Sequence, residues 1–82
     1  MYRIRYEGSV RKKLDIIPDK YYKKVEKAIL DLKIEPRPFG VKKIGPNDWR
    51  IRIGDYRALY EIDDKEKIIS IYRVKHRKDV YR

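Results

Sequence analysis

The chain contains no cysteine and a single histidine among its 82 residues. The missing thiols exclude a disulfide framework and a zinc–thiolate site, and one histidine argues against a histidine-rich metal site. No apolar run approaches the roughly 20 residues that span a bilayer, and the opening MYRIRYEG lacks the apolar core of a signal peptide. We therefore expect a cytoplasmic protein that does not enter a membrane and needs no metal or cofactor.

Charge is abundant and one-sided. Lys and Arg number 23 against 13 Asp and Glu, which gives a formal net charge of +10. The excess is greatest in residues 36–60, where six basic residues face only Asp48 and Asp55. Such a balance predicts affinity for polyanions, whether RNA, DNA, an acidic protein or an anionic membrane surface. High Lys and Glu content also fits solubility or a hot habitat, but neither explains the imbalance.

The chain reads as one domain, residues 1–82, because no repeat, linker or low-complexity tract interrupts it. Alternating residues in 2–7 predict a first strand, which Gly8 breaks. Ser9 is a suitable N-cap for a short amphipathic helix, and Pro18 ends that helix. Because proline is tolerated in a first turn, Pro18 can also open the next helix.

The rest of the chain predicts a longer helix followed by a meander of strands. Apolar residues at Tyr22, Val25 and Ile29 recur at helical spacing, which places an amphipathic helix over about residues 19–35. A proline-rich loop over residues 37–46 then leads to three segments that we expect to form strands: 49–53, 56–62 and 68–74. The order β-α-α-β-β-β indicates an α+β domain, with an N-terminal strand, a helical hairpin and a three-stranded antiparallel meander that the first strand joins.

The stretch WRIRIGDYRALYEI carries three arginines whose spacing brings them together. Side chains two apart on a strand share a face, so Arg50 and Arg52 point away from the alternating apolar residues. Gly54-Asp55 predicts a two-residue type II′ turn, and Arg57 lies two residues beyond it, near Arg52. Three like charges destabilise a sheet unless an anion neutralises them, and guanidinium groups bind phosphate bidentately. The alternative is three solvated charges on an ordinary polar face.

The basic tail HRKDVYR adds groups that can transfer protons or stack on bases. Histidine is the only side-chain type whose ordinary pKa lies near neutrality, and His76 is the single histidine. Arg77 follows it, and Tyr81 can stack on a base or donate a proton. The alternatives are a structural histidine and a tyrosine that only packs. Their position after a central strand, beside a cationic face, favours a functional role.

The combination WRIRIGDYRALYEID, the strand IISIYRV and the ending HRKDVYR resembles the RelE branch of the RelE/ParE toxin superfamily, over essentially the whole chain. The resemblance implies a microbial-ribonuclease-like toxin of a type II toxin–antitoxin system, which enters the ribosomal A site and cuts mRNA there. The implied reaction needs no metal: a ribose 2′-hydroxyl attacks the adjacent phosphate and gives a 2′,3′-cyclic phosphate and a 5′-hydroxyl. The implied partners are a RelB-like antitoxin, in a hetero-oligomer, and the ribosome with its mRNA.

Carried over by position, the resemblance assigns roles to residues of the strands and tail. Arg50 and Arg52 match the two basic positions of the second strand, and Arg57 opens the next strand. Arg77 follows the last strand, and Tyr81 matches a tail tyrosine that stacks on the nucleotide. The implied catalytic residues are Arg50, Arg52, Arg57, His76, Arg77 and Tyr81. The implied RNA-binding residues are Lys42, Lys43, Arg73, Lys75 and Lys78.

Two departures from the family pattern bear on mechanism. Some relatives have lysine on the second strand, where it can act as a base, but Arg50 and Arg52 keep their protons and instead stabilise charge. His76 and Tyr81 remain the candidates for proton transfer, with their acid and base roles open. Lys75 stands where many relatives have glycine.

Two other functions fit the same fold: a ParE-like inhibitor of DNA gyrase, and a non-catalytic ribosome- or RNA-binding module.

Overall fold

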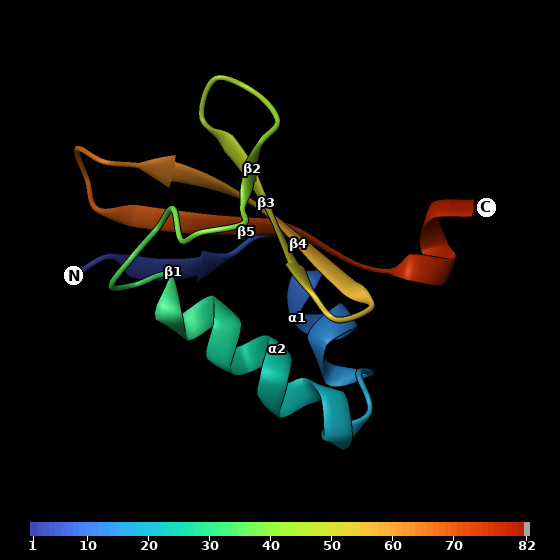
Figure 1. Ribbon diagram of the computed structural model, residues 1–82. Coiled ribbons are helices and arrows are strands. Elements are labelled where there is room, and N and C mark those ends of the chain that lie inside the picture. Colours follow the sequence, from blue (N-terminus) through green and yellow to red (C-terminus); the bar gives the residue numbers. More distant parts are fainter. Residues whose placement is uncertain (82) are drawn as a thin grey trace.

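The computed structural model describes the backbone of residues 1–81 and the side chains of residues 1–79. One five-stranded sheet carries a helical hairpin on one side, and a short 3₁₀ helix follows the last strand (Figure 1). In chain order the elements are β1 (Arg3–Tyr6), α1 (Val10–Asp15), α2 (Asp19–Asp31), β2 (Lys42–Lys43), β3 (Asp48–Ile53), β4 (Tyr56–Asp63), β5 (Ile68–His76) and η1 (Arg77–Tyr81). No helix within the described residues is long and apolar enough to cross a membrane.

The strands lie in the order β1-β5-β4-β3-β2, so β1 and β2 form the two edges. β1 pairs with β5 in parallel, and every other neighbouring pair is antiparallel. The expected meander is present, and the first strand joins it beside β5. The predicted α+β class is therefore confirmed, and the apolar run of β5 lies inside the sheet as expected.

Several segments differ from the sequence-based expectation. The loop predicted over residues 37–46 contains β2, a strand of two lysines that pairs with β3. So short a polar segment has no alternation to reveal it, and it depends on its neighbour for hydrogen bonds. The second helix ends at Asp31, before the predicted end near residue 35, and the tail forms η1. The sheet thus has one more strand than the sequence predicted.

Alternation along the strands places one sheet face under the helices. On β4 every second residue from Tyr56 to Ile62 is buried, and β5 contributes Ile69 and Ile71 to the same core. The apolar stripe of α2, centred on Val25, covers them. The opposite side of the sheet carries no helix (Figure 1). We call it the open face, and it holds the side chains that alternate with the core residues.

Polar contacts fix the proline-rich loop to this frame. Tyr60 is fully buried, and its hydroxyl donates to the Pro36 carbonyl at 2.8 Å. Burial raises the pKa of Tyr60 to about 12. Arg37 donates two hydrogen bonds of 2.8 and 3.3 Å to the Asp64 carboxylate, and its guanidinium lies over the Trp49 ring. The Arg37 hydrogen bonds hold the pKa of Asp64 below its ordinary value. The loop is therefore tied to β4 and to the β4–β5 turn.

Candidate functional site

Three basic side chains form a row across one end of the open face. Arg52 of β3 lies directly opposite Arg57 of β4, and Arg57 lies directly opposite Lys75 of β5. Directly opposed residues of antiparallel strands point to the same face, with their Cβ atoms about 5 Å apart. The predicted approach of Arg57 to Arg52 is confirmed, and Lys75 extends this first basic row by one strand.

A second basic row lies beside the first, one step further from the β3–β4 turn. Lys42 of β2 lies opposite Arg50 of β3. Arg50 lies opposite Leu59 of β4, which in turn lies opposite Arg73 of β5. The two rows join six predicted residues into what we call the basic cluster: Lys42, Arg50, Arg52, Arg57, Arg73 and Lys75.

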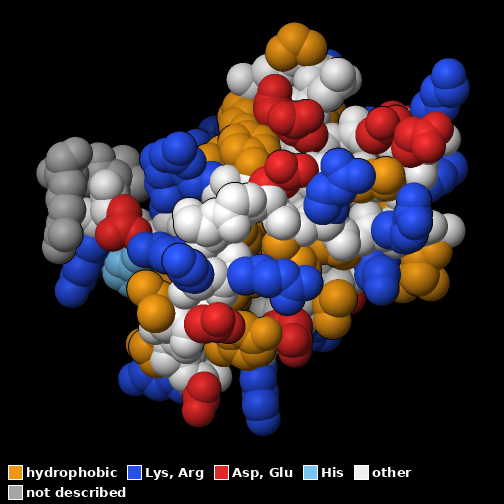
Figure 2. Space-filling view, turned by 180° about the vertical axis from the view of Figure 1, so that it is seen from behind, with side chains coloured by type: hydrophobic (Ala, Val, Ile, Leu, Met, Phe, Trp, Pro, Cys, Tyr) orange, Lys and Arg blue, Asp and Glu red, His pale blue; other side chains and the backbone are white. Residues whose placement is uncertain are grey.

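No described carboxylate forms a salt bridge with the basic cluster. The four salt bridges among residues 1–79 use other cations: Arg5, Lys13, Lys27 and Arg37. Figure 2 shows Lys and Arg side chains scattered over much of the visible face, with Asp and Glu side chains among them. The six side chains repel one another at short range, and an anion with several oxygens removes that repulsion. Because guanidinium groups bind phosphate through paired hydrogen bonds, the cluster suits a phosphodiester chain.

The tail is held at the same end of the sheet as the first basic row. Arg77 opens η1, and its backbone N–H donates to the Asp55 carbonyl in the β3–β4 turn, 2.7 Å away. The Asp79 carboxylate accepts from Lys13 Nζ of α1 at 2.8 Å and from the His76 backbone N–H at 3.0 Å. These contacts anchor η1 to the helices and to the turn, and they leave the Arg77 side chain exposed.

His76 does not join the basic cluster, which corrects the expectation that it stands beside the arginines. It lies opposite Tyr56, whose buried ring belongs to the helix face, and the two rings meet edge to face with centroids 4.9 Å apart. Because side chains alternate along β5, Lys75 takes the open face and His76 takes the other. The Lys78 backbone N–H donates to His76 Nδ1 at 3.1 Å, so this nitrogen acts as an acceptor.

Three other predicted residues also lie apart from the cluster or cannot be placed. Lys43 pairs with Trp49, and its ammonium lies 5.8 Å from the centre of the Trp49 ring, so it points away from the open face. Lys78 is exposed on η1. The side chain of Tyr81 lies outside the described residues, and its stacking role stays a prediction.

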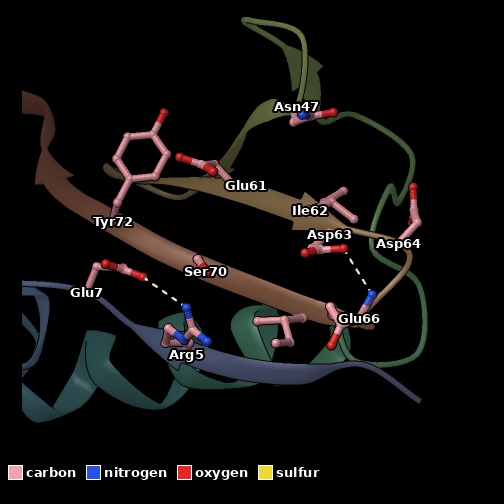
Figure 3. Close-up of a pocket in the computed structure, with 11 residues that line it drawn as sticks. Arg5, Glu7, Asn47, Glu61, Ile62, Asp63, Asp64, Glu66, Ser70 and Tyr72 are labelled. Carbon is pink, nitrogen blue, oxygen red and sulfur yellow. Dashed lines mark hydrogen bonds and ion pairs between the residues drawn. The ribbon is translucent and has the colours of Figure 1, made fainter.

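The far end of the open face has the opposite charge. A groove of about 690 Å³ runs along β4 and β5 toward the turn that joins them (Figure 3). Besides Arg5, its charged lining residues are all acidic: Glu7, Glu61, Asp63, Asp64 and Glu66. No group of three or more acidic or histidine residues in the described chain is arranged to hold a metal ion. This acidic groove was not predicted, although the run EIDDKE at residues 61–66 is its sequence signal.

Tyr72 lies between the two charged regions. It is the extra residue of a β-bulge in β5, opposite the step from Leu59 to Tyr60. Figure 3 shows its ring beside Glu61, at one end of the acidic groove. Partial burial raises the pKa of Tyr72, and the carboxylates of Asp48 and Glu61 raise it further. Its phenol therefore stands near acidic side chains, at the border between the acidic groove and the basic cluster. No sequence signal marks the bulge, so this residue was missed.

The fold and the site together define a small basic α+β domain whose open sheet face carries six cations at one end. The chain belongs to the ParE toxin family: the model described as the ParE toxin of the type II toxin–antitoxin system, parDE, matches residues 2–81. The predicted membership of the RelE/ParE toxin superfamily is thereby confirmed.

Individual relatives agree with this assignment. Toxin RelG of Mycobacterium tuberculosis is 36% identical over 84 residues, which cover 99% of this chain and 97% of that protein. A chain of the archaeal RelE–RelB complex from Pyrococcus horikoshii has a TM-score of 0.81 at 29% identity, covering 93% of this chain and 94% of its own. The isolated E. coli RelE toxin has a TM-score of 0.83 at 20% identity, covering 99% and 92%, a likeness that concerns the fold alone.

Proposed function

We propose that this protein is the toxin of a type II toxin–antitoxin system and acts in the cytoplasm as a ribosome-dependent endoribonuclease on mRNA in the A site. The observation that carries the proposal is the basic cluster, in which four strands present six cations without a salt-bridge partner among the described side chains. An RNA backbone supplies the missing negative charge. Full-length similarity to a curated toxin supports the toxin assignment.

The proposed reaction is a metal-independent transesterification. The 2′-oxygen forms a bond to the adjacent phosphorus as it loses its proton, and the bond to the 5′-oxygen breaks as that oxygen gains one. Negative charge gathers on the nonbridging oxygens, where the guanidinium groups of Arg52 and Arg57 are suited to stabilise it. Neither arginine is a base, because guanidinium keeps its proton. Proton transfer falls to the tail, with Tyr81 as the first candidate since His76 occupies the other face.

Programmed ribosomes test this proposal. The protein is incubated with a defined mRNA, with and without ribosomes, and the cut ends are mapped. We expect cleavage only with ribosomes, ends that carry a 2′,3′-cyclic phosphate and a 5′-hydroxyl, and no effect of a chelator. Arg77→Ala should cleave at least about 100-fold more slowly, because it removes a donor to the developing charge. Equal cleavage of free mRNA, or an Arg77→Ala variant as active as the parent, contradicts the proposal.

The proposed partner is a RelB-like antitoxin. RelE–RelB complexes from Pyrococcus horikoshii and Methanococcus jannaschii are among the structures that this chain resembles. A net charge of +10 favours an acidic chain, which would neutralise the basic cluster and compete with the ribosome. We expect a small acidic reading frame beside this gene, and co-expression of its product with this protein should yield a stable hetero-oligomer. A complex that cuts mRNA at the full rate of the free protein counts against the competition.

Inhibition of DNA gyrase is the second candidate function, because the matching family model is described by the name ParE. A supercoiling assay separates the two candidates. Loss of supercoiling without mRNA cleavage supports the gyrase inhibitor. Ribosome binding with no cleavage at any pH supports a non-catalytic module on the same fold.

A further inference from the structure

Phe39 projects entirely into solvent, with an exposed fraction of 107%. It lies in the proline-rich loop and packs against none of the core. Singly exposed apolar residues are ordinary on protein surfaces, so exposure alone says little. What distinguishes Phe39 is the combination of a fixed backbone beneath it and a basic cleft beside it.

The backbone around Phe39 forms a tight, anchored turn. The Val41 N–H donates to the Pro38 carbonyl at 3.3 Å, and Gly40 has a φ of +96°. This pattern matches a type II turn, in which the third position requires a positive φ and Phe39 takes the second. The segment just before the turn is tied to β4 and to the β4–β5 turn. A ring presented by such a backbone loses little conformational freedom on binding.

Gly40, the residue after Phe39, lines a basic cleft. Gly40, Lys42, Arg50 and Arg52 line a hollow of about 210 Å³, and three of them belong to the basic cluster. Single-stranded nucleic acid offers the matching pair of groups, because phosphates and flat bases alternate along its chain. We propose that Phe39 is a stacking platform for an unpaired RNA base whose phosphate occupies this cleft.

The chemistry of the surroundings favours a base over an apolar protein side chain. The cleft walls consist of three cations and a glycine, so an apolar side chain would find no second apolar wall there. The nearby ring of Trp49 is covered by the cations of Arg37 and Lys43. A base can stack on a single aromatic ring, and the phosphates on either side of it are attracted to cations. The choice of RNA rather than DNA rests on the proposed function.

Equilibrium binding of a short 2′-O-methyl oligonucleotide, which cannot be cut, tests the platform without ribosomes. At about 50 mM salt, where electrostatic binding is strong, Phe39→Ala should bind about tenfold more weakly than the parent. Phe39→Trp should bind at least as tightly as the parent, and Phe39→Leu should bind like the alanine variant. On an abasic oligonucleotide of the same length, all four proteins should bind equally. Ile34→Ala removes an apolar side chain that is 76% exposed on another part of the surface, and it should match the parent throughout.

Several results would overturn the platform. These are undetectable binding by the parent, equal binding by the parent and Phe39→Ala, a leucine variant as tight as the parent, or a loss that persists on the abasic strand. An alanine variant that loses only antitoxin binding shows that Phe39 contacts a protein, and it also overturns the platform.

The platform and the proposed nuclease can fail separately. If the parent cuts no mRNA but Phe39→Ala still shows the base-dependent loss of RNA binding, the proposed nuclease is refuted and the platform stands. Cleavage by the parent with unchanged RNA binding by Phe39→Ala refutes the platform alone.

Discussion

The two ends of the open face share the same strands but carry opposite charge. Along β4, the open-face residues change from Arg57 through Leu59 to Glu61 and Asp63. On β3 the arginines likewise give way to Asp48. The backbone geometry is continuous, so only the side chains separate the basic cluster from the acidic groove. A polyanion on this face would be attracted to one half of the sheet and repelled from the other, so the charges favour a path across the strands over a path along them.

The two ends also differ in how far their charges are satisfied. In the acidic groove, Asp64 pairs with Arg37 at 2.8 Å and Glu7 lies 3.7 Å from Arg5. The basic cluster has no such partner among the described side chains. The acidic end is thus partly neutralised by the fold itself, whereas no described carboxylate neutralises the basic end.

The largest expected effect is on the rate of mRNA cleavage, when one arginine is removed from the basic end and compared with removal of one arginine from the acidic end. Arg57→Ala, in the first basic row, should slow mRNA cleavage about 100- to 1,000-fold, because it removes a donor to the developing charge. Arg5→Ala, which removes the same side chain beside the acidic groove, should leave the rate within a few-fold of the parent. Single-turnover cleavage on programmed ribosomes measures both. Equal losses from the two variants would remove the functional contrast between the ends.

Tyr60 lies on the buried face of β4, beneath the open face, and donates a hydrogen bond to the Pro36 carbonyl. Its pKa is raised from 10 to about 12, so above pH 10 the unfolded chain loses this proton first and folding weakens. We expect a loss of roughly 2–3 kcal/mol between pH 10 and 12. Denaturant titrations of the parent and Tyr60→Phe measure it. The variant should lack this component and should be less stable at neutral pH by about 1–2 kcal/mol, because the Pro36 carbonyl loses its donor.

A smaller effect is expected from neutralising the acidic groove. Glu61→Gln combined with Asp63→Asn should tighten RNA binding several-fold, because repulsion of the phosphates falls. If the RNA then extends along the strands, the salt slope should steepen by about 0.7 for each phosphate gained. Asp15→Asn with Asp19→Asn makes the same change in net charge on the helical side. A similar gain from that control would show that net charge, not the groove, governs binding.

The smallest effect is expected from the tail anchor. Lys13→Ala removes a half-buried ion pair with Asp79, worth up to about 1 kcal/mol. The result should be loosening of η1 beside the first basic row, seen as faster hydrogen exchange of the His76 amide, which donates to Asp79. Lys27→Ala breaks an exposed ion pair on α2 and should leave that amide unchanged. Unchanged exchange in Lys13→Ala would show that the pair does not anchor the tail.

Much of the basic cluster was predictable because alternation and turn chemistry are local. The two-residue turn at Gly54, with its φ of +61°, sets the register that places Arg57 opposite Arg52. The position of His76 was missed because β5 was expected to end at residue 74, whereas pairing with β4 extends it to 76. Such pairing depends on the partner strand, so the sequence of β5 alone does not reveal it.

Other features depend on contacts that no local pattern encodes. β2 exists because β3 supplies its hydrogen bonds, and the bulge at Tyr72 arises where the β4 and β5 registers differ. The acidic groove brings Glu7, which follows β1, beside residues 61–66 of the β4–β5 hairpin. The run EIDDKE shows the charge, but its position across from the arginines follows only from the assembled sheet.

The pairing of β1 with β5 has a consequence for the order of events in folding. β1 ends at Tyr6 and β5 begins at Ile68, so this contact closes a loop of about 60 residues. The hairpins that build the basic cluster close much shorter loops and are favoured to form earlier. Mutual repulsion among the cations must then be overcome before the parallel pairing completes the sheet. Phosphate in the refolding buffer should therefore act as a kinetic aid, and it should speed the hairpin stage more than the final closure.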